Sequence, residues 1–257
     1  MPKFAANLSL LFTEWPFEER FAQAAAAGFA AVEAQFPYAM APDACARALS
    51  RAGVALILFN TPNAAFPGGE RGIACRPDRV EEYRAGVAQA LAYAKATGCP
   101  TLNTLAGVAP PGVAPAVWRA TLIDNLRFAA DACARAGVEL VMEAINTRDV
   151  PGFCIATSAD ALAVIDAVGS ADLKLQYDIY HMQRMEGEIA ATLERHLPRI
   201  GHIQIADNPG RGEPGTGEIN FPFLFAHLDR IGYRGWVGCE YAPTTDTRAS
   251  LAWMARA

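Results

Sequence analysis

Short apolar runs of strand length alternate along the chain with longer amphipathic runs that have a helical period and are rich in alanine. The expected strands cover residues 4–8, 31–33, 54–59, 101–105, 138–143, 173–178, 200–206 and 235–240. The expected helices cover residues 17–27, 43–52, 78–97, 115–136, 158–168, 186–196, 221–231 and 247–254. A glycine follows most of these helices, as is typical of a helix that closes on a left-handed residue.

The order of these elements predicts the fold class. Strands that alternate with helices indicate an α/β protein with a parallel sheet and right-handed crossovers. Eight such units in 257 residues match a single-domain (β/α)8 TIM barrel over residues 1–257, a fold whose catalytic groups lie at the carboxyl ends of the strands. The alternative is an open doubly wound sheet, which normally has a glycine-rich phosphate turn after its first strand, whereas residues 7–11 read NLSLL.

Composition disfavours several kinds of partner. The chain has 22 Lys and Arg residues against 27 Asp and Glu residues, a formal net charge of −5, and no basic stripe, so we expect no binding to nucleic acid. No apolar run approaches the roughly 18 residues of a membrane span, and the first residues do not resemble a leader, so we expect no membrane contact. The six cysteines are scattered singly, which is typical of reduced thiols in a cytoplasmic protein.

Four consecutive expected strands end in an oxygen-bearing side chain. Glu143, Asp178 and Glu240 close their strands, and Gln204 lies near the end of the strand at 200–206. One such residue alone is usually a helix cap or a solvated loop residue, but four on the same rim of a barrel favour a functional site. Three neighbouring carboxylates would raise one another's pKa, and a divalent cation is the simplest relief. Because all the ligand atoms are oxygens, Mg²⁺ or Mn²⁺ fits better than Zn²⁺.

Two further residues of this rim are candidates for supporting roles. His181 follows Asp178 by three residues and could polarise a substrate oxygen, although a lone histidine is more often structural. Glu33 ends the second expected strand, and we weigh a supporting role and a purely structural one equally.

Two loops rich in glycine and proline follow expected strands. Residues 61–72 are interpreted as a lid whose Arg71 pairs with a substrate carboxylate, the alternative being an ordinary surface loop. Residues 207–218 contain four glycines and two prolines, which indicates a shaped active-site loop. We expect Asp207 and Arg211 of this second loop to contact the substrate.

Two glutamates beside a chelated cation favour one class of reaction. One carboxylate removes a proton from a carbon next to a carbonyl, which gives an enediolate, and the other returns a proton to the neighbouring carbon. The outcome is aldose–ketose isomerisation or epimerisation. A metal-dependent aldolase or hydrolase could use the same ligands.

Several long runs resemble one known family. They are FAANLS at 4–9, GERGIAC at 69–75, QYDIYHMQRMEGE at 176–188, IADNP at 205–209, RGEPGTGEIN at 211–220 and GWVGCEY at 235–241. Together they resemble the hydroxypyruvate isomerase family of the xylose isomerase-like barrels, and the resemblance covers essentially the whole chain.

The resemblance implies a reaction and the residues that perform it. Glu143 and Glu240 would be the acid/base pair, and Glu143, Asp178, Gln204 and Glu240 would bind a divalent cation, usually magnesium. The implied reaction interconverts hydroxypyruvate and 2-hydroxy-3-oxopropanoate, while a close branch isomerises four-carbon 2-oxo-tetronates. Residues 34–40 and 58–63 depart from the commoner family forms, which leaves the substrate size open.

Three other functions fit the sequence less well. An apurinic-site endonuclease would need a zinc centre rich in histidine, and the chain has four histidines. A sugar-acid binding protein without activity would have a broken acid/base pair. A ketose 3-epimerase acts on a neutral sugar, whereas Arg71 and Arg211 suit a small anionic sugar acid. The oligomeric state is left open, a homo-oligomer included.

Overall fold

Eight parallel strands form a closed barrel in the order of the sequence, from β1 to β8 and back to β1. We describe residues 1–62 and 71–256 of a computed structural model. The strands are β1 (Lys3–Asn7), β2 (Ala31–Ala34), β3 (Ala55–Asn60), β4 (Thr101–Thr104), β5 (Glu139–Glu143), β6 (Leu173–Asp178), β7 (Ile200–Ile205) and β8 (Trp236–Cys239). The expectation of a closed barrel is confirmed, because β1 pairs with β8 along Lys3–Ala6.

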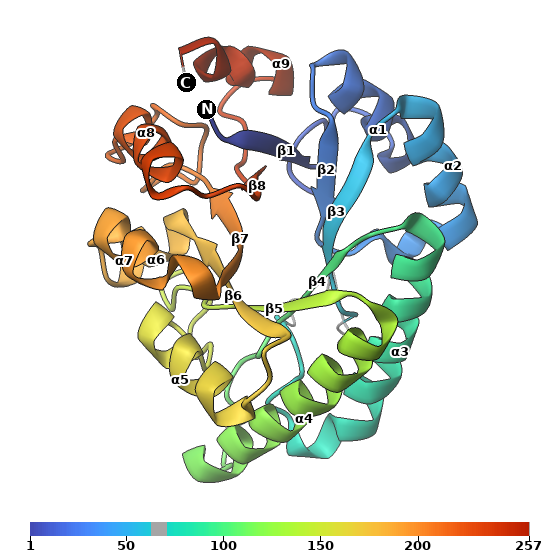
Figure 1. Ribbon diagram of the computed structural model, residues 1–257, viewed down its shortest axis with the longest axis vertical. Coiled ribbons are helices and arrows are strands. Elements are labelled where there is room, and N and C mark those ends of the chain that lie inside the picture. The colour runs from blue at the N-terminus through green and yellow to red at the C-terminus, as the bar shows by residue number, and fades with distance from the viewer. Residues whose placement is uncertain (63–70, 257) are drawn as a thin grey trace.

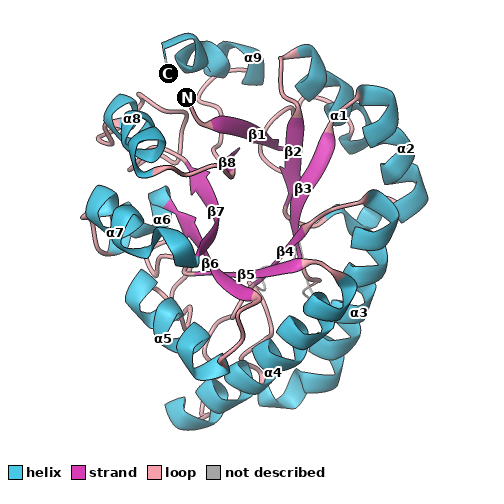
Figure 2. Cartoon of the chain, in the orientation of Figure 1, coloured by secondary structure: helices cyan, strands magenta, loops and turns pink. Residues whose placement is uncertain are grey.

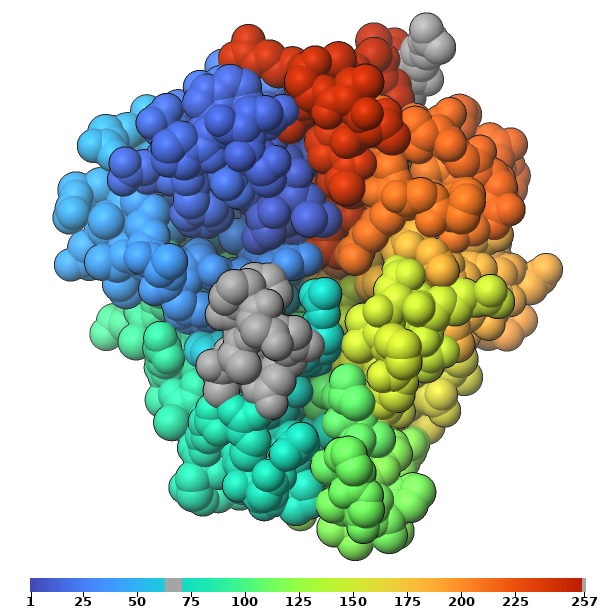
Figure 3. Space-filling model, turned by 180° about the vertical axis from the view of Figure 1, so that it is seen from behind, coloured from blue at the N-terminus to red at the C-terminus, as the bar shows by residue number. Residues whose placement is uncertain are grey.

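The helices form an outer layer around the barrel (Figures 1 and 2). They are α1 (Phe17–Ala26), α2 (Pro42–Ala52), α3 (Val80–Thr97), α4 (Pro115–Ala136), α5 (Ser158–Val168), α6 (Ile179–Met185), α7 (Ile189–His196), α8 (Phe221–Ile231) and α9 (Thr247–Ser250). Short 3-10 segments occur at Pro37–Ala39, Pro77–Arg79, Leu197–Arg199 and Leu251–Arg256. Figure 3 shows the opposite face from Figure 1, where the first and last parts of the chain lie side by side.

One expected helix is corrected by the structure. The helix expected at 186–196 begins only at Ile189, and α6 follows β6 directly. The Asp178 carboxylate causes this early start, because it accepts hydrogen bonds from the backbone N–H groups of Tyr180 and His181 and so caps the new helix. The last residue of a strand is therefore also the first cap of a helix, which fixes the direction of its second oxygen.

Buried polar side chains of several strands meet inside the barrel, whereas the large apolar core lies between the barrel and the helices. Large buried side chains such as Tyr83, Phe21 and Leu122 belong to that apolar core. Glu33 on β2 bonds to His202 on β7, although β1 and β8 separate these two strands around the barrel, so this contact crosses the lumen. The strand ends thus deliver polar groups to the interior, where they meet.

Two expectations from composition can be compared with the structure. All six cysteines lie within the described residues and are free thiols, as their scattered positions predicted. Within residues 1–62 and 71–256, no helix has the length and apolar character needed to cross a membrane.

Candidate active site

A small cavity of about 70 Å³ opens at the carboxyl ends of the strands. Its lining residues are Gln35, Phe36, Asn60, Arg71, Leu105, Glu143, Ile145, Asp149, Val150, His181, Arg211 and Glu240. The lining combines two carboxylates that were predicted as acid and base with two arginines and a histidine that were predicted to bind substrate. One wall is apolar, so the cavity has a charged side and a hydrophobic side.

Three predicted carboxylates are buried around this cavity. Glu143 ends β5, Asp178 ends β6, and Glu240 follows β8. Burial, followed by the charges of Glu240 and Asp178, raises the pKa of Glu143 well above its ordinary value. Burial likewise raises the pKa of Asp178, and it raises that of Glu240 to about 7. A carboxyl group with a pKa near 7 can both take up and release a proton at neutral pH.

Arg211 is the counter-ion of these carboxylates. Its Nη2 donates a hydrogen bond to Glu240 Oε2 at 2.6 Å and lies 3.8 Å from Asp178 Oδ2. The guanidinium also lies over the ring of Tyr180, 5.2 Å from its centroid. This contact places the predicted substrate-binding cation inside the cavity, between carboxylates that come from different strands.

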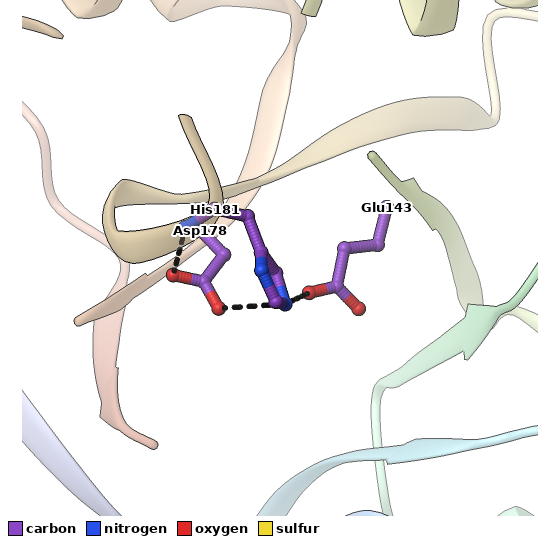
Figure 4. A group of neighbouring side chains, drawn as sticks. All are labelled: Glu143, Asp178 and His181. Carbon is purple, nitrogen blue, oxygen red and sulfur yellow. Dashed lines mark hydrogen bonds and ion pairs between the residues drawn. The ribbon is translucent and has the colours of Figure 1, made fainter. Parts of the chain in front are cut away.

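His181 lies between two of the carboxylates (Figure 4). Its Nε2 is 3.6 Å from Glu143 Oε1 and 3.6 Å from Asp178 Oδ2. Burial and the positive charge of Arg211 lower the pKa of His181 well below its ordinary value, so the ring is neutral. A neutral imidazole in this position can donate or accept a hydrogen bond without adding charge to the site.

The predicted metal ligands are brought together only in part. Ligand atoms of Glu143, Asp178 and His181 all lie within 4.8 Å of one another. Among the described residues, the buried Asp178 Oδ2 has no hydrogen-bond partner, as expected of an oxygen that awaits a cation. Gln204 lies beside Asp178 on the next strand, but its side chain is engaged elsewhere. The carboxylate oxygens fit a divalent cation. The Gln204 amide would first have to leave its hydrogen bonds to Gln176 and Glu33 before it could bind the same ion.

A buried hydrogen-bond network in the lumen lies next to the site and holds Gln204. The Gln204 amide nitrogen donates to Glu33 Oε1 at 2.6 Å, and its oxygen accepts from Gln176 at 2.6 Å. Glu33 also accepts from Asn7 Nδ2 at 2.9 Å and lies 2.6 Å from His202 Nε2. Glu33 is fully buried and meets three donors, so it supports the site and does not line it.

The sequence interpretation missed three amides that bond to the two glutamates predicted as acid and base. Asn7 Nδ2 and Gln35 Nε2 donate to Glu240 Oε1 at 3.1 and 3.0 Å. Asn103 Nδ2 donates to Glu143 Oε2 at 3.2 Å. Asn7 ends β1 and Asn103 lies near the end of β4. The carboxylates were selected as polar residues at strand ends, and the same criterion could have selected these two amides.

Asp207 has a different position from the one expected. Its two carboxylate oxygens accept hydrogen bonds from the backbone N–H groups of Asn208, Gly215, Gly217 and Ile219, at 2.9 to 3.1 Å. It is not among the described residues that line the cavity. Asp207 therefore organises the loop that carries Arg211, in place of the substrate contact that we expected.

Arg71 lies at the edge of the described residues and lines the cavity, while most of the segment interpreted as a lid lies outside the described residues. Residues 63–70, which include Gly68, Gly69 and Glu70, lie outside the described residues. Arg71 itself is exposed and lines the cavity, and it has no ion-pair partner among residues 1–62 and 71–256. Its guanidinium is thus available to a ligand carboxylate.

Comparison with known proteins gives a consistent result over the full chain. The family model described as "Xylose isomerase-like TIM barrel" matches residues 21–257. Hydroxypyruvate isomerase of Escherichia coli (strain K12) is 49% identical over 254 residues, which cover 99% of this chain and 98% of that protein. The 2-oxo-tetronate isomerase of Cupriavidus necator is 45% identical over 254 residues, with the same coverage of 99% and 98%.

A solved structure agrees with this placement. A crystal structure from Brucella melitensis, titled as an AP endonuclease of family 2, is 42% identical and has a TM-score of 0.96, with 100% of this chain and 99% of that chain covered. The chain belongs to the xylose isomerase-like TIM barrel family and, within it, to the sugar-acid isomerases of the hydroxypyruvate isomerase group.

Proposed function

We propose that the protein interconverts hydroxypyruvate and 2-hydroxy-3-oxopropanoate, with Glu143 and Glu240 as the acid/base pair. The observation that carries this proposal is the pair of buried carboxyl groups on one small cavity, each with a raised pKa. The identity to the E. coli and C. necator relatives supports a sugar acid as the substrate.

The reaction requires a proton to leave one carbon and another to join its neighbour. One glutamate takes a proton from C3 of hydroxypyruvate, the C–H electron pair forms a C2–C3 double bond, and the carbonyl oxygen O2 becomes negative. The other glutamate gives a proton to C2, while the hydroxyl proton on O3 is lost, O3 becomes the new carbonyl oxygen and O2 is protonated. The N–H of a neutral His181 and the charge of Arg211 would stabilise the negative oxygens of the enediolate.

A divalent cation fits this chemistry. The residues that would hold it are Glu143, Asp178, Gln204 and Glu240, with Mg²⁺ favoured and Mn²⁺ as the alternative. Such an ion would supply positive charge that acidifies the C–H bond next to the carbonyl. The buried Asp178 Oδ2, which accepts no hydrogen bond from the described residues, is the observation that best supports such an ion.

Cavity size and charge favour a short anionic substrate. A cavity of about 70 Å³ is well below the usual size of a ligand pocket, which favours a small acid. Arg71 and Arg211 supply two positive charges for its carboxylate. The second candidate is a 2-oxo-tetronate, whose fourth carbon would lie against the apolar wall formed by Phe36, Ile145 and Val150. A neutral ketose, the substrate of a 3-epimerase, would offer no carboxylate to Arg71, which has no ion-pair partner in the described part of the chain.

Cleavage of DNA is disfavoured, although the Brucella protein is titled as an endonuclease. Of the four histidines, His181 alone lines the cavity, and His227 on α8 bonds to a backbone oxygen of α7. A zinc centre rich in histidine cannot be assembled from these positions. The six free thiols support a reducing compartment, and we propose that the protein acts in the cytoplasm.

The test is a parallel assay of hydroxypyruvate, a 2-oxo-tetronate and a neutral ketose in deuterated water. We expect turnover of the sugar acids, with solvent deuterium at the carbon that is protonated. Glu143→Gln and Glu240→Gln should each lower kcat by about 10² to 10⁴-fold while thermal unfolding still shows a folded protein. Product without solvent deuterium would contradict proton exchange through the enediolate, and near-normal activity of either variant would remove that glutamate from the pair.

A further inference from the structure

We propose that Asn146 is a positioning residue that fixes which ring nitrogen of His181 bears the hydrogen. Asn146 is fully buried in the loop after β5 and is not one of the residues that the sequence singled out. The importance of this assignment for catalysis rests on the proposed function, since His181 would act on substrate oxygens. The assignment itself can be tested without substrate.

The orientation of the Asn146 amide is set by four neighbouring groups. Its Oδ1 accepts hydrogen bonds from the backbone N–H groups of Arg148 and Asp149, at 3.1 and 2.9 Å. Its Nδ2 donates to Asp149 Oδ2 at 3.0 Å and lies 2.7 Å from His181 Nδ1. The reversed amide would direct its NH₂ group at two backbone N–H groups and its oxygen at a carboxylate, so both sides would become repulsive.

Asp149 is held as an acceptor by its other neighbours. Tyr180 donates its hydroxyl hydrogen to Asp149 Oδ2 at 2.7 Å, and Arg184 donates to the Tyr180 oxygen at 2.7 Å. Burial alone would raise the pKa of Asp149, but the hydrogen bonds from Asn146 and Tyr180 lower it overall, so the group is a carboxylate. A carboxylate offers only acceptor atoms, and Asn146 must therefore turn its NH₂ group to this side.

The tautomer of the His181 ring follows from the hydrogen bonds that Asn146 Nδ2 donates. One hydrogen of Asn146 Nδ2 goes to Asp149, and the other points at His181 Nδ1, which must accept it with its lone pair. The ring hydrogen then lies on Nε2, the nitrogen that faces Glu143 Oε1 and Asp178 Oδ2.

This tautomer has two consequences for the site. A nitrogen that carries a hydrogen has no lone pair for a metal, so His181 is excluded from the ligand set although it lies near Glu143 and Asp178. The same N–H can donate to a substrate oxygen that becomes negative during the reaction. The opposite tautomer would present a lone pair to that oxygen and to both carboxylates, which would repel it.

The test is nitrogen NMR of protein with ¹⁵N-labelled histidine, in which four ring systems give few signals. His181→Asn assigns the His181 signals by their loss. We expect Nδ1 of His181 to be unprotonated and Nε2 to be protonated in the native protein. Asn146→Asp keeps an acceptor for the two backbone N–H groups but replaces the donor with an acceptor, so the ring hydrogen should move to Nδ1. We expect kcat to fall by about 10²-fold while KM changes less than about threefold.

Two further variants keep the outcome interpretable. Asn146→Ala removes the donor without adding charge, and we expect both tautomers to appear, which covers the case in which Asn146→Asp fails to fold. Asn220→Asp makes the same chemical change at an exposed helix cap that only accepts a hydrogen bond from Phe223, and we expect the native tautomer and native kcat.

Specific results would overturn the inference. A native His181 with its hydrogen on Nδ1, or an unchanged tautomer in both Asn146 variants, would show that Asn146 does not set the ring. Unchanged kcat in a variant with a reversed ring would show that the tautomer is irrelevant to catalysis. If the ring behaves as expected but no sugar acid is isomerised, the proposed function fails while the tautomer assignment stands.

Discussion

Arg211 Nη2 lies 2.6 Å from Glu240 Oε2, and the same nitrogen lies 3.8 Å from Asp178 Oδ2. One guanidinium group thus offsets the repulsion between these two carboxylates. Arg211 lowers the pKa of Glu240, against a larger effect of burial, and the result is a value of about 7. The protonation of Glu240 is therefore tuned by a residue that the loop after β7 supplies.

Removal of this charge should shift the pH dependence of activity. In Arg211→Gln, the pKa of Glu240 should rise above about 7, since the main group that lowers it is gone. A base must be ionised to act, so activity is lost as pH falls through its pKa, and the acidic limb of kcat/KM should move to higher pH. Arg211→Lys keeps the charge and should move the limb less. An unshifted limb in Arg211→Gln would contradict the pairing.

The buried carboxyls should also make stability depend on pH. The pKa of Glu240 is raised from an ordinary 4.5 to about 7, so the folded protein holds this proton more tightly than the unfolded chain. The contribution is present below about pH 4.5 and is lost as pH rises through about 7, up to about 3 kcal/mol for this group.

This dependence can be measured by urea unfolding in the presence of EDTA. We expect the free energy of unfolding to fall between pH 5 and pH 7.5, and to fall less in Glu240→Gln, which has no carboxyl to ionise. Mg²⁺ or Mn²⁺ should restore stability at pH 7.5 if the carboxylates hold the ion. A native protein whose stability ignores both pH and the metal would count against the cluster as described.

Gly238 makes room for the carboxylate of Glu33. A Cβ atom at position 238 would overlap the Glu33 side chain, which is held by three donors and cannot move freely. We expect Gly238→Ala to destabilise the protein by about 1–3 kcal/mol and to lower activity through displacement of Glu33. Gly210→Ala is the matched control, because a Cβ there meets no atom within 4 Å, and its unfolding curve should overlay the native one.

Arg71 should contribute to substrate affinity more than to turnover. It lines the cavity and has no ion-pair partner in the described part of the chain, so a substrate carboxylate would not have to displace one. We expect Arg71→Ala to raise KM for hydroxypyruvate about tenfold, or about 1.4 kcal/mol, with little change in kcat. The exposed Arg47 on α2 provides the control, as Arg47→Ala should leave KM unchanged. A neutral substrate analogue that loses as much affinity would argue against a carboxylate contact.

The sequence predicted the barrel because its signals are local. The bounds of α4, α5 and α8 coincide with the expected ranges, since the apolar period and the following glycine are both read within one helix. The short helix α6 has seven residues, too few to show a period, and its start depends on the carboxylate of Asp178. Glu143, Asp178 and Glu240 could be selected from the sequence because each directly follows a short apolar run that is itself a local pattern.

Other features depend on contacts that no local pattern contains. Asn146 reads as an ordinary loop residue, and its role emerges only because Asp149 and His181 lie on either side of its amide. Asp207 was expected to contact the substrate because it begins the glycine-rich loop after the strand at 200–206. In the structure, the backbone N–H groups of Gly215 and Gly217 donate hydrogen bonds to the Asp207 carboxylate. The spacing of these residues in the sequence does not show that the loop folds back in this way.

The hydrogen bonds that the Asp207 carboxylate accepts from its own loop hold that loop in one shape within the folded chain. Arg211 sits within it at a left-handed backbone angle, φ +55°, that an untethered arginine would seldom adopt. The entropy cost of arranging this segment is thus met during folding and need not be deducted from the affinity for a substrate. A three-carbon acid can make only a few contacts with its site. A binding arginine that is already in position lowers the entropy cost of binding such a small molecule.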